Sequence, residues 1–146
     1  MPSFDTKRDG FLFFGATQRN EQWSWSAKTP NGNKIIITIW QHEMMGRGED
    51  QYLDTRELEN DNDEWLDSNG NRERRGLLKH AQDELDGIVY ILMTRATNVE
   101  AGPPWEIGSC YSWEMADGRV NRMKLTFLDE ETGHFRVEYL DSVPLN

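Results

Sequence analysis

Three tryptophans, Trp23, Trp25 and Trp40, fall within eighteen residues, on two segments that are expected to be neighbouring strands. Indole rings are large, stiff and stackable, so this grouping builds either a heavy core or a flat-walled binding site. Open rings can sandwich an unpaired or flipped base, and each stack contributes about 1–3 kcal/mol. The sequence is compatible with both interpretations.

Polar residues that could read a base edge accompany these rings. Asn20 precedes the first tryptophan, and Gln41 and Glu43 follow the third. Amide and carboxylate groups supply the donors and acceptors that distinguish one base from another, or they support a pocket wall. Further aromatic rings follow a Pro-Pro break near residue 104. The predicted ligand-binding set is therefore Asn20, Trp23, Trp25, Trp40, Gln41, Glu43, Trp105 and Trp113.

Arginines at the start of a predicted helix are the candidate phosphate contacts. Arg72, Arg74 and Arg75 lie within four residues and give this helix a basic first half. Cations of this kind position nucleic-acid backbones. The same arginines could instead neutralise the acidic segment that precedes them, and this alternative stays open.

The usual catalytic templates are absent from the sequence. His42-Glu43 has no second histidine four residues after the first, so it is not a zinc-protease helix motif. One cysteine cannot form a thiolate-rich zinc site, and no phosphate-binding loop or serine nucleophile elbow occurs. We therefore predict a non-enzymatic protein with no catalytic residue, no metal and no cofactor.

Composition restricts the class of protein. The 146 residues suit one domain, and a net charge of −10 opposes a simple duplex-backbone binder, which needs a basic stripe. The same charge permits an acidic surface that docks a basic partner or imitates nucleic acid. Cys110 is the single cysteine, which suits a reducing cytoplasm, and no run of about 20 apolar residues suggests a membrane span.

Several elements are needed to position the candidate residues. Residues 34–42 and 88–96 are apolar on both faces and are predicted to be buried strands, while 123–128 and 134–140 are predicted to form a hairpin. Apolar residues at helical spacing predict a helix over 72–85. The predicted class is α+β: a strongly curved, mostly antiparallel sheet or a small, partly closed β-barrel of six or seven strands, with one main helix packed against it.

Domain organisation is predicted to be simple. Residues 1–10 are expected to be a flexible arm, and 11–146 a single α+β domain. Phe11–Phe14 is expected to enter the fold as a strand, and a Pro-Asn-Gly-Asn turn at 30–33 to close a hairpin. Residues from about 44 to 71 are strongly acidic and predict a solvated surface excursion.

The segment from Phe14 to Glu43 resembles the N-terminal module of bacterial HNH-type, restriction-like endonucleases. The resemblance is carried by Phe-Gly-Ala (14–16), Asn-x-x-Trp-Ser-Trp (20–25) and Trp-Gln-x-Glu (40–43), and it is thin over 72–140. It implies recognition of nucleic acid, with a modified base among the candidates, ahead of a separate nuclease. No His-Asn-His motif occurs in these 146 residues, and the acidic insert is a further departure from that family.

Two hypotheses follow from the sequence. The first is a cytoplasmic, non-catalytic nucleic-acid-binding module that reads a modified or unpaired base by stacking and works beside a restriction or defence nuclease, away from membranes. The second is an acidic protein-interaction module or a nucleic-acid-mimicking inhibitor. An enzyme acting on a nucleotide or another small ligand is a third, weaker candidate.

Overall fold

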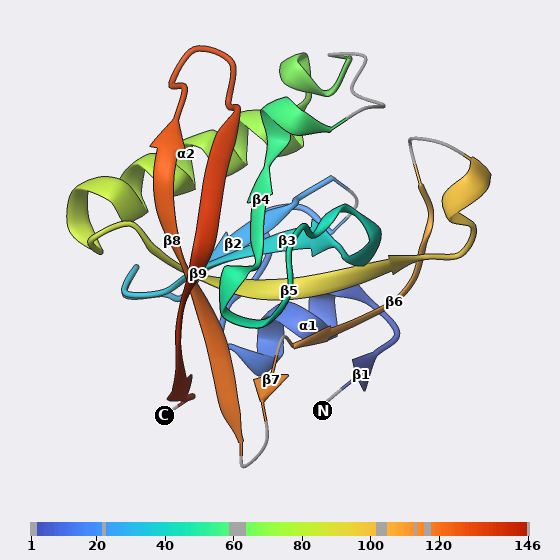
Figure 1. Cartoon of the computed structure of the whole chain (residues 1–146), viewed down its shortest axis with the longest axis horizontal. Helices are drawn as coiled ribbons and strands as arrows, with labels where there is room; N and C mark the ends of the chain where they lie inside the picture. The colour runs from blue at the N-terminus through green and yellow to red at the C-terminus, as the bar shows by residue number, and fades with distance from the viewer. Residues whose placement is uncertain are drawn as a thin grey trace.

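The computed structural model describes residues 3–21, 23–58, 64–101, 105–112, 114–115 and 118–145 (Figure 1). In these ranges, one mostly antiparallel sheet is covered by two α-helices, α1 (Lys7–Phe13) and α2 (Asn69–Glu84). The strands are β1 (Ser3–Phe4), β2 (Ser26–Lys28), β3 (Ile35–Trp40), β4 (Tyr52–Asp54), β5 (Ile88–Ala96), β6 (Ile107–Ser112), β7 (Glu114–Met115), β8 (Arg119–Leu128) and β9 (Phe135–Pro144).

Strand β5 is the centre of the sheet because it has neighbours along both edges. One edge pairs in parallel with β3, through partners such as Ile37 and Ile91. The other edge pairs first with β8 and then with β6, both antiparallel. The main path through the sheet is β1-β6-β5-β8-β9-β4, and β2 extends it beyond β3. This central position agrees with the prediction that residues 88–96 are covered on both faces.

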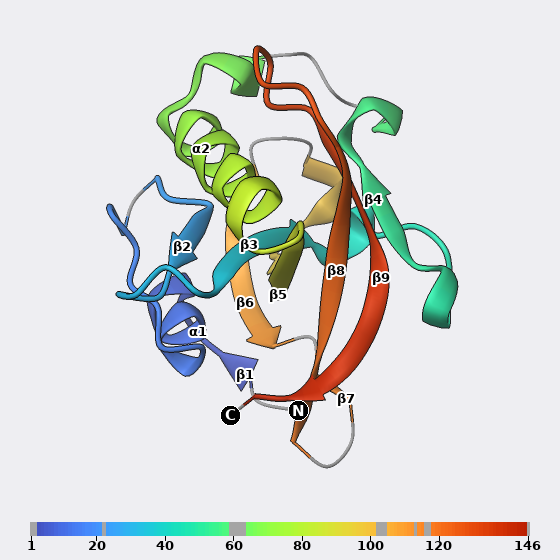
Figure 2. The ribbon, with the colours of Figure 1, turned by 90° about the vertical axis from the view of Figure 1, so that its left-hand side faces the viewer.

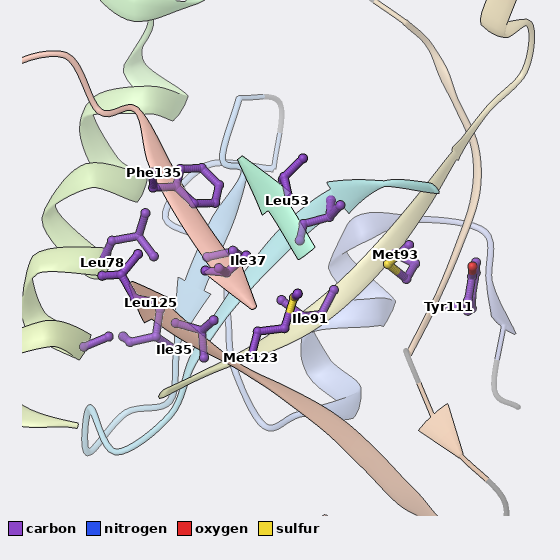
Figure 3. Packing of buried hydrophobic residues seen from close by; sticks show 14 residues of the cluster. Ile35, Ile37, Leu53, Leu78, Ile91, Met93, Tyr111, Met123, Leu125 and Phe135 are labelled. Carbon is purple, nitrogen blue, oxygen red and sulfur yellow. The ribbon is translucent and has the colours of Figure 1, made fainter. Parts of the chain in front are cut away.

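The helices cover opposite faces of the sheet. Residues of α2 such as Leu78 pack with Ile35, Ile37 and Ile91 in the larger core (Figure 3). Phe11 of α1 packs in a second core that includes Ile36, the neighbour of Ile35 and Ile37 on β3. Side chains of a strand alternate between its faces, so one continuous apolar segment supplies both cores. Strand β3 is therefore buried on both sides, as predicted.

Two hairpins flank this centre. Strand β2 pairs antiparallel with β3 across the predicted 30–33 turn. Strands β8 and β9 form a long, bent hairpin within the sheet, between β5 and β4 (Figure 2), with register shifts after Arg122 and after Leu125. Such irregularities bend a strand and increase its twist. Both predicted hairpins are confirmed, and the β8–β9 hairpin is longer than predicted.

The N-terminal segment differs from the prediction. Residues 3–10 were expected to be an arm, but Ser3 and Phe4 pair with β6, and α1 begins at Lys7. The predicted strand from Phe11 to Phe14 is also wrong, because Phe11 lies inside this helix. Thr6 caps α1 by accepting a hydrogen bond from the backbone N–H of Asp9, which satisfies one of the free donors of the first turn.

The acidic excursion is partly built into the sheet. Strand β4 pairs with β9 inside the range that was expected to be surface only, and Leu53 points into the core with 3% of its surface exposed. Residues 59–63 of the excursion lie outside the described ranges. Helix α2 begins three residues before the predicted start and ends one residue before the predicted end.

The α+β class and the mostly antiparallel sheet are confirmed. The partly closed barrel is not, since the described strands run from β1 to β4 without closing. The described part of the chain has nine strands where six or seven were expected, and the short strands β1, β4 and β7 account for the difference.

Candidate functional site

The three tryptophans of the sequence motif do not form one binding site. Trp25 lies against α2, where a Cβ added to Gly70 would come within 2.5 Å of the indole. Trp40 is the last residue of β3 and lies on the same face of the strand as Ile36, which belongs to the core beside α1. Because alternate residues of a strand face opposite ways, Trp25 and Trp40 lie on different sides of the sheet. The prediction that Trp23, Trp25 and Trp40 form one cage is therefore wrong.

Trp40 belongs to a compact aromatic group with His42 and Trp105, here called the Trp40 cluster. The ring centroids of His42 and Trp105 are 4.4 Å apart, and those of Trp40 and Trp105 are 5.6 Å apart, both in edge-to-face geometry. The indole N–H of Trp105 donates to the carbonyl oxygen of Val99 at 2.8 Å. Partial desolvation lowers the pKa of His42 below its usual value. Trp105 contacts both Trp40 and His42 edge-on, so the three rings pack against one another. Gln41 is exposed beside them.

Trp25 belongs to a second aromatic group, the Arg74 cluster. The Arg74 guanidinium lies 5.1 Å from the ring centroid of Trp25, 5.5 Å from Trp65 and 4.8 Å from Phe135. Burial lowers the pKa of Arg74 to about 10, and the negative charge of Glu43 opposes this shift. Glu43 therefore interacts electrostatically with the buried guanidinium of the Arg74 cluster.

The three arginines predicted to contact phosphate lie in three different environments. Arg74 is only 9% exposed, so it cannot contact a phosphate, and that prediction is wrong. Arg75 donates to the carbonyl oxygen of Glu131 in the β8–β9 turn. Arg72 is exposed on the first turns of α2. Of the three arginines, Arg72 is the exposed one.

The remaining tryptophan of the motif, Trp23, lies beside an open hollow of about 300 Å³ at the N-terminal end of α2. The indole is half-buried, and Arg72 approaches from the helix. The volume is at the lower limit of small-ligand pockets, so it suits one ring and not a large enclosed molecule. This Trp23 hollow is lined by Arg19, Trp23, Asn69, Arg72 and Glu73.

Hydrogen bonds hold the loop that carries Trp23. The backbone N–H of Ser24 donates to the carbonyl oxygen of Asn20 at 2.9 Å, and the Asn20 N–H donates to the Ser24 hydroxyl at 3.0 Å. The Lys7 ammonium donates to the Ser24 carbonyl oxygen at 2.8 Å. Burial lowers the pKa of Lys7, and the negative charge of Glu73 opposes this shift. Asn20 thus supports the Trp23 loop through its backbone.

The start of α2 adds an electrostatic preference to the hollow. Ser68 caps the helix by accepting from the backbone N–H of Asn71 at 3.1 Å. The N-terminal end of a helix carries a partial positive charge, which favours anions nearby. Together with Arg19 and Arg72, this end makes the hollow locally more positive than the chain as a whole.

A neighbouring hollow of about 390 Å³ borders α1, but its lining has three acidic residues and two basic ones. Its acidic residues include Glu21, whose carboxylate lies 3.3 Å from the Arg8 guanidinium. Such an exposed pair contributes little to stability or selectivity. The residues lining it are Asp5, Thr6, Lys7, Arg8, Asp9, Gln18, Glu21 and Ile107.

Sequence reasoning missed Arg19, Asn69 and Glu73. The predicted helix begins at Arg72, so Asn69 lies outside it. Arg19 adjoins Asn20 in the polar loop of the motif, and that position was the available signal. Trp113, a predicted ligand-binding residue, lies outside the described ranges.

The described residues contain neither a metal-ligand cluster nor a membrane-spanning helix. No group of three or more histidine, cysteine, aspartate or glutamate side chains there is placed to hold a metal ion. No helix there has the length and apolar character that crossing a membrane requires.

Comparisons with protein-family models, curated proteins and solved structures found no match for this chain. The resemblance to HNH-type endonucleases stays a hypothesis carried by the motif residues.

Proposed function

We propose that this chain is a non-catalytic nucleic-acid-binding module that stacks an unpaired or modified base on Trp23. The observation that carries the proposal is the half-buried Trp23 indole in an open hollow, beside Arg19 and Arg72 at the start of α2. A base needs a flat apolar face, and its phosphate needs cations or free backbone donors. The Trp23 hollow supplies both within the span of one nucleotide.

The local charge of the Trp23 hollow makes nucleic-acid binding compatible with the acidic composition of the chain. The net charge of −10 opposes contact with a long duplex backbone, but Arg19 and Arg72 serve one or two phosphates. The helix end adds a further preference for an anion. We therefore expect binding to single strands or displaced bases, with weak affinity for undistorted duplex.

The cellular setting is proposed from the sequence resemblance over 13–43. A recognition module of this kind would work beside a restriction or defence nuclease in the cytoplasm. That nuclease is the proposed protein partner.

The acidic-interaction hypothesis has less support from the described residues. Asp54 accepts hydrogen bonds from Arg56, and Glu138 lies 2.8 Å from the Arg136 guanidinium. Arg136 also pairs with Glu57. A surface that imitates nucleic acid needs carboxylates that face a partner, whereas these carboxylates are neutralised within the chain.

Fluorescence anisotropy tests the proposal with labelled single-stranded and base-modified oligonucleotides at low and high salt. Trp23→Ala should abolish binding, because it removes the stacking surface. Trp105→Ala is the matched control, since it removes another half-buried indole from the separate Trp40 cluster and should leave binding unchanged. Absence of binding to every oligonucleotide at low salt, or equal losses in both variants, would refute the proposal.

A further inference from the structure

The hairpin of β2 and β3, together with the segment that precedes it, has a positive local charge. Residues 10–42 carry three basic side chains, Arg19, Lys28 and Lys34, and one acidic side chain, Glu21. Glu21 is already paired with Arg8, at 3.3 Å. Although the chain as a whole has a net charge of −10, this stretch therefore attracts a polyanion.

Lys28 and Arg19 lie on neighbouring segments at the edge of the sheet. Strand β2 pairs with β3 along one side, and Thr17 forms an antiparallel bridge to Lys28 along the other. Arg19 follows Thr17 by two residues, which is at most about 7 Å of chain. Because Arg19 lines the Trp23 hollow, Lys28 is the next cation along this edge from the hollow.

Lys28 also lies on the same face of the sheet as the hollow. In the β2–β3 register it is opposite Ile35, which belongs to the core beneath α2. Opposed residues of an antiparallel pair share a face, and α2, which carries Arg72, lies on that face beside β2 (Figure 2). The Lys28 side chain is exposed and has no ion pair or hydrogen bond within the described residues. Its charge is therefore available to a ligand.

We propose that a single strand continues from the Trp23 hollow along the outer edge of β2 and places its next phosphate on Lys28, an inference that rests on the proposed function. A base on Trp23 leaves its own phosphate to Arg19 and Arg72, and the adjoining sugar-phosphate unit reaches Lys28. The preferred ligand is then a single-stranded segment of several nucleotides, which binds more tightly than a mononucleotide.

Competition anisotropy tests this path. Unlabelled oligo-dT of one to about six nucleotides displaces a labelled oligo-dT from the protein. Affinity for the wild type should rise with length as the added phosphates reach Lys28. Lys28→Gln should weaken the longer strands about threefold at low salt, the effect of one exposed ion pair, and reduce the salt slope by about 0.7. It should leave the affinity for the mononucleotide unchanged.

Lys34→Gln is the matched control, because it removes the same charge from the same hairpin. Lys34 continues the β2–β3 ladder opposite Thr29, whose N–H donates to the Lys34 carbonyl oxygen at 3.1 Å. Since side chains alternate along a strand, Lys34 faces the side of Ile36, which packs beside α1. This variant should keep the wild-type affinities and salt slope. Thermal unfolding of both variants checks that each is folded.

The outcomes separate the two proposals. Equal affinity of the wild type for the mononucleotide and the longer strands, or equal losses in Lys28→Gln and Lys34→Gln, overturns the path along β2 and leaves stacking on Trp23 intact. Failure of every length to bind at low salt overturns both proposals together.

Discussion

Gly70 lies directly against the indole of Trp25. A Cβ at this position would come within 2.5 Å of the ring and within 2.7 Å of the Trp23 carbonyl oxygen. At Gly70 the backbone of α2 therefore packs directly against Trp25 and the backbone of Trp23. This contact joins two segments more than forty residues apart and brings Arg72 to the same hollow as Trp23.

Gly70→Ala should destabilise the protein by about 1–3 kcal/mol, because an added methyl group must displace the ring or the loop backbone. Gly76→Ala is the control in the same helix: nothing lies within 4 Å of its added Cβ, and it is exposed. Since alanine is the better helix former, Gly76→Ala should stabilise by about 0.5–1 kcal/mol. Chemical unfolding monitored by tryptophan fluorescence measures both. Equal effects in the two variants would contradict the close contact.

Asp54 should make the protein sensitive to acid. Its carboxylate is 3% exposed and accepts hydrogen bonds from the Arg56 side chain at 2.6 and 2.9 Å, which hold its pKa below the ordinary value of 3.8. A carboxylate whose pKa is lower in the folded than in the unfolded protein stabilises the fold at pH values above its unfolded pKa. This stabilisation is lost as the pH falls through the folded pKa. Asp54→Asn should cost about 1–3 kcal/mol near neutral pH. That cost should shrink below pH 3.8, as wild-type Asp54 itself becomes protonated.

Unfolding in denaturant across a pH series measures this difference. Asp83→Asn is the control, because Asp83 is exposed and makes only a surface pair with Lys79 at 3.2 Å. Surface pairs contribute at most about 1 kcal/mol, so this variant should differ little from the wild type. A constant cost of Asp54→Asn from neutral to acid pH would count against the ion pair.

The sequence predicts the elements whose signal is local and repeated. The strand predicted over residues 88–96 has the same bounds as β5. The alternation of Ile35, Ile36 and Ile37 correctly predicts that both faces of β3 are buried in a core. The error at α1 has a physical origin: four apolar residues are too few to separate a strand from a buried helix turn. The decisive signal was Thr6 with Asp9 three residues later, a capping pattern that the apolar run obscured.

The site depends on contacts that no local pattern encodes. The spacing of Trp23, Trp25 and Trp40 suggests one cage, but it does not show on which side of the sheet each ring lies. The separation follows from the packing of α2 on Trp25, which Gly70 permits. Arg74 likewise looks like its neighbours in sequence, and only the helix orientation directs it among three rings.

Cys110 should be inert in the folded protein. Its side chain is fully buried, its thiol donates to the Thr6 carbonyl oxygen at 3.1 Å, and desolvation raises its pKa to about 11. The thiolate is the reactive species, so a disulfide reagent at about pH 8 should label the native protein only through unfolding. Absorbance of the released thiolate follows the reaction. The denatured protein is the control and should react at the rate of a free thiol, whereas rapid labelling of the native protein would show that α1 opens readily.

Salt dependence should identify the residues that hold phosphate. Each neutralised phosphate of a single strand contributes about −0.7 to the slope of log K against log salt. Arg19→Gln and Arg72→Gln should each reduce the steepness by about that amount, since both arginines line the Trp23 hollow. Arg75→Gln removes the same charge from the same helix as Arg72, but Arg75 is bonded to the Glu131 carbonyl oxygen and should leave the slope unchanged. Anisotropy titrations between about 50 and 200 mM salt give the slopes. Equal slopes in all three variants would place the phosphate elsewhere and leave Trp23 as a stacking surface without its anchor.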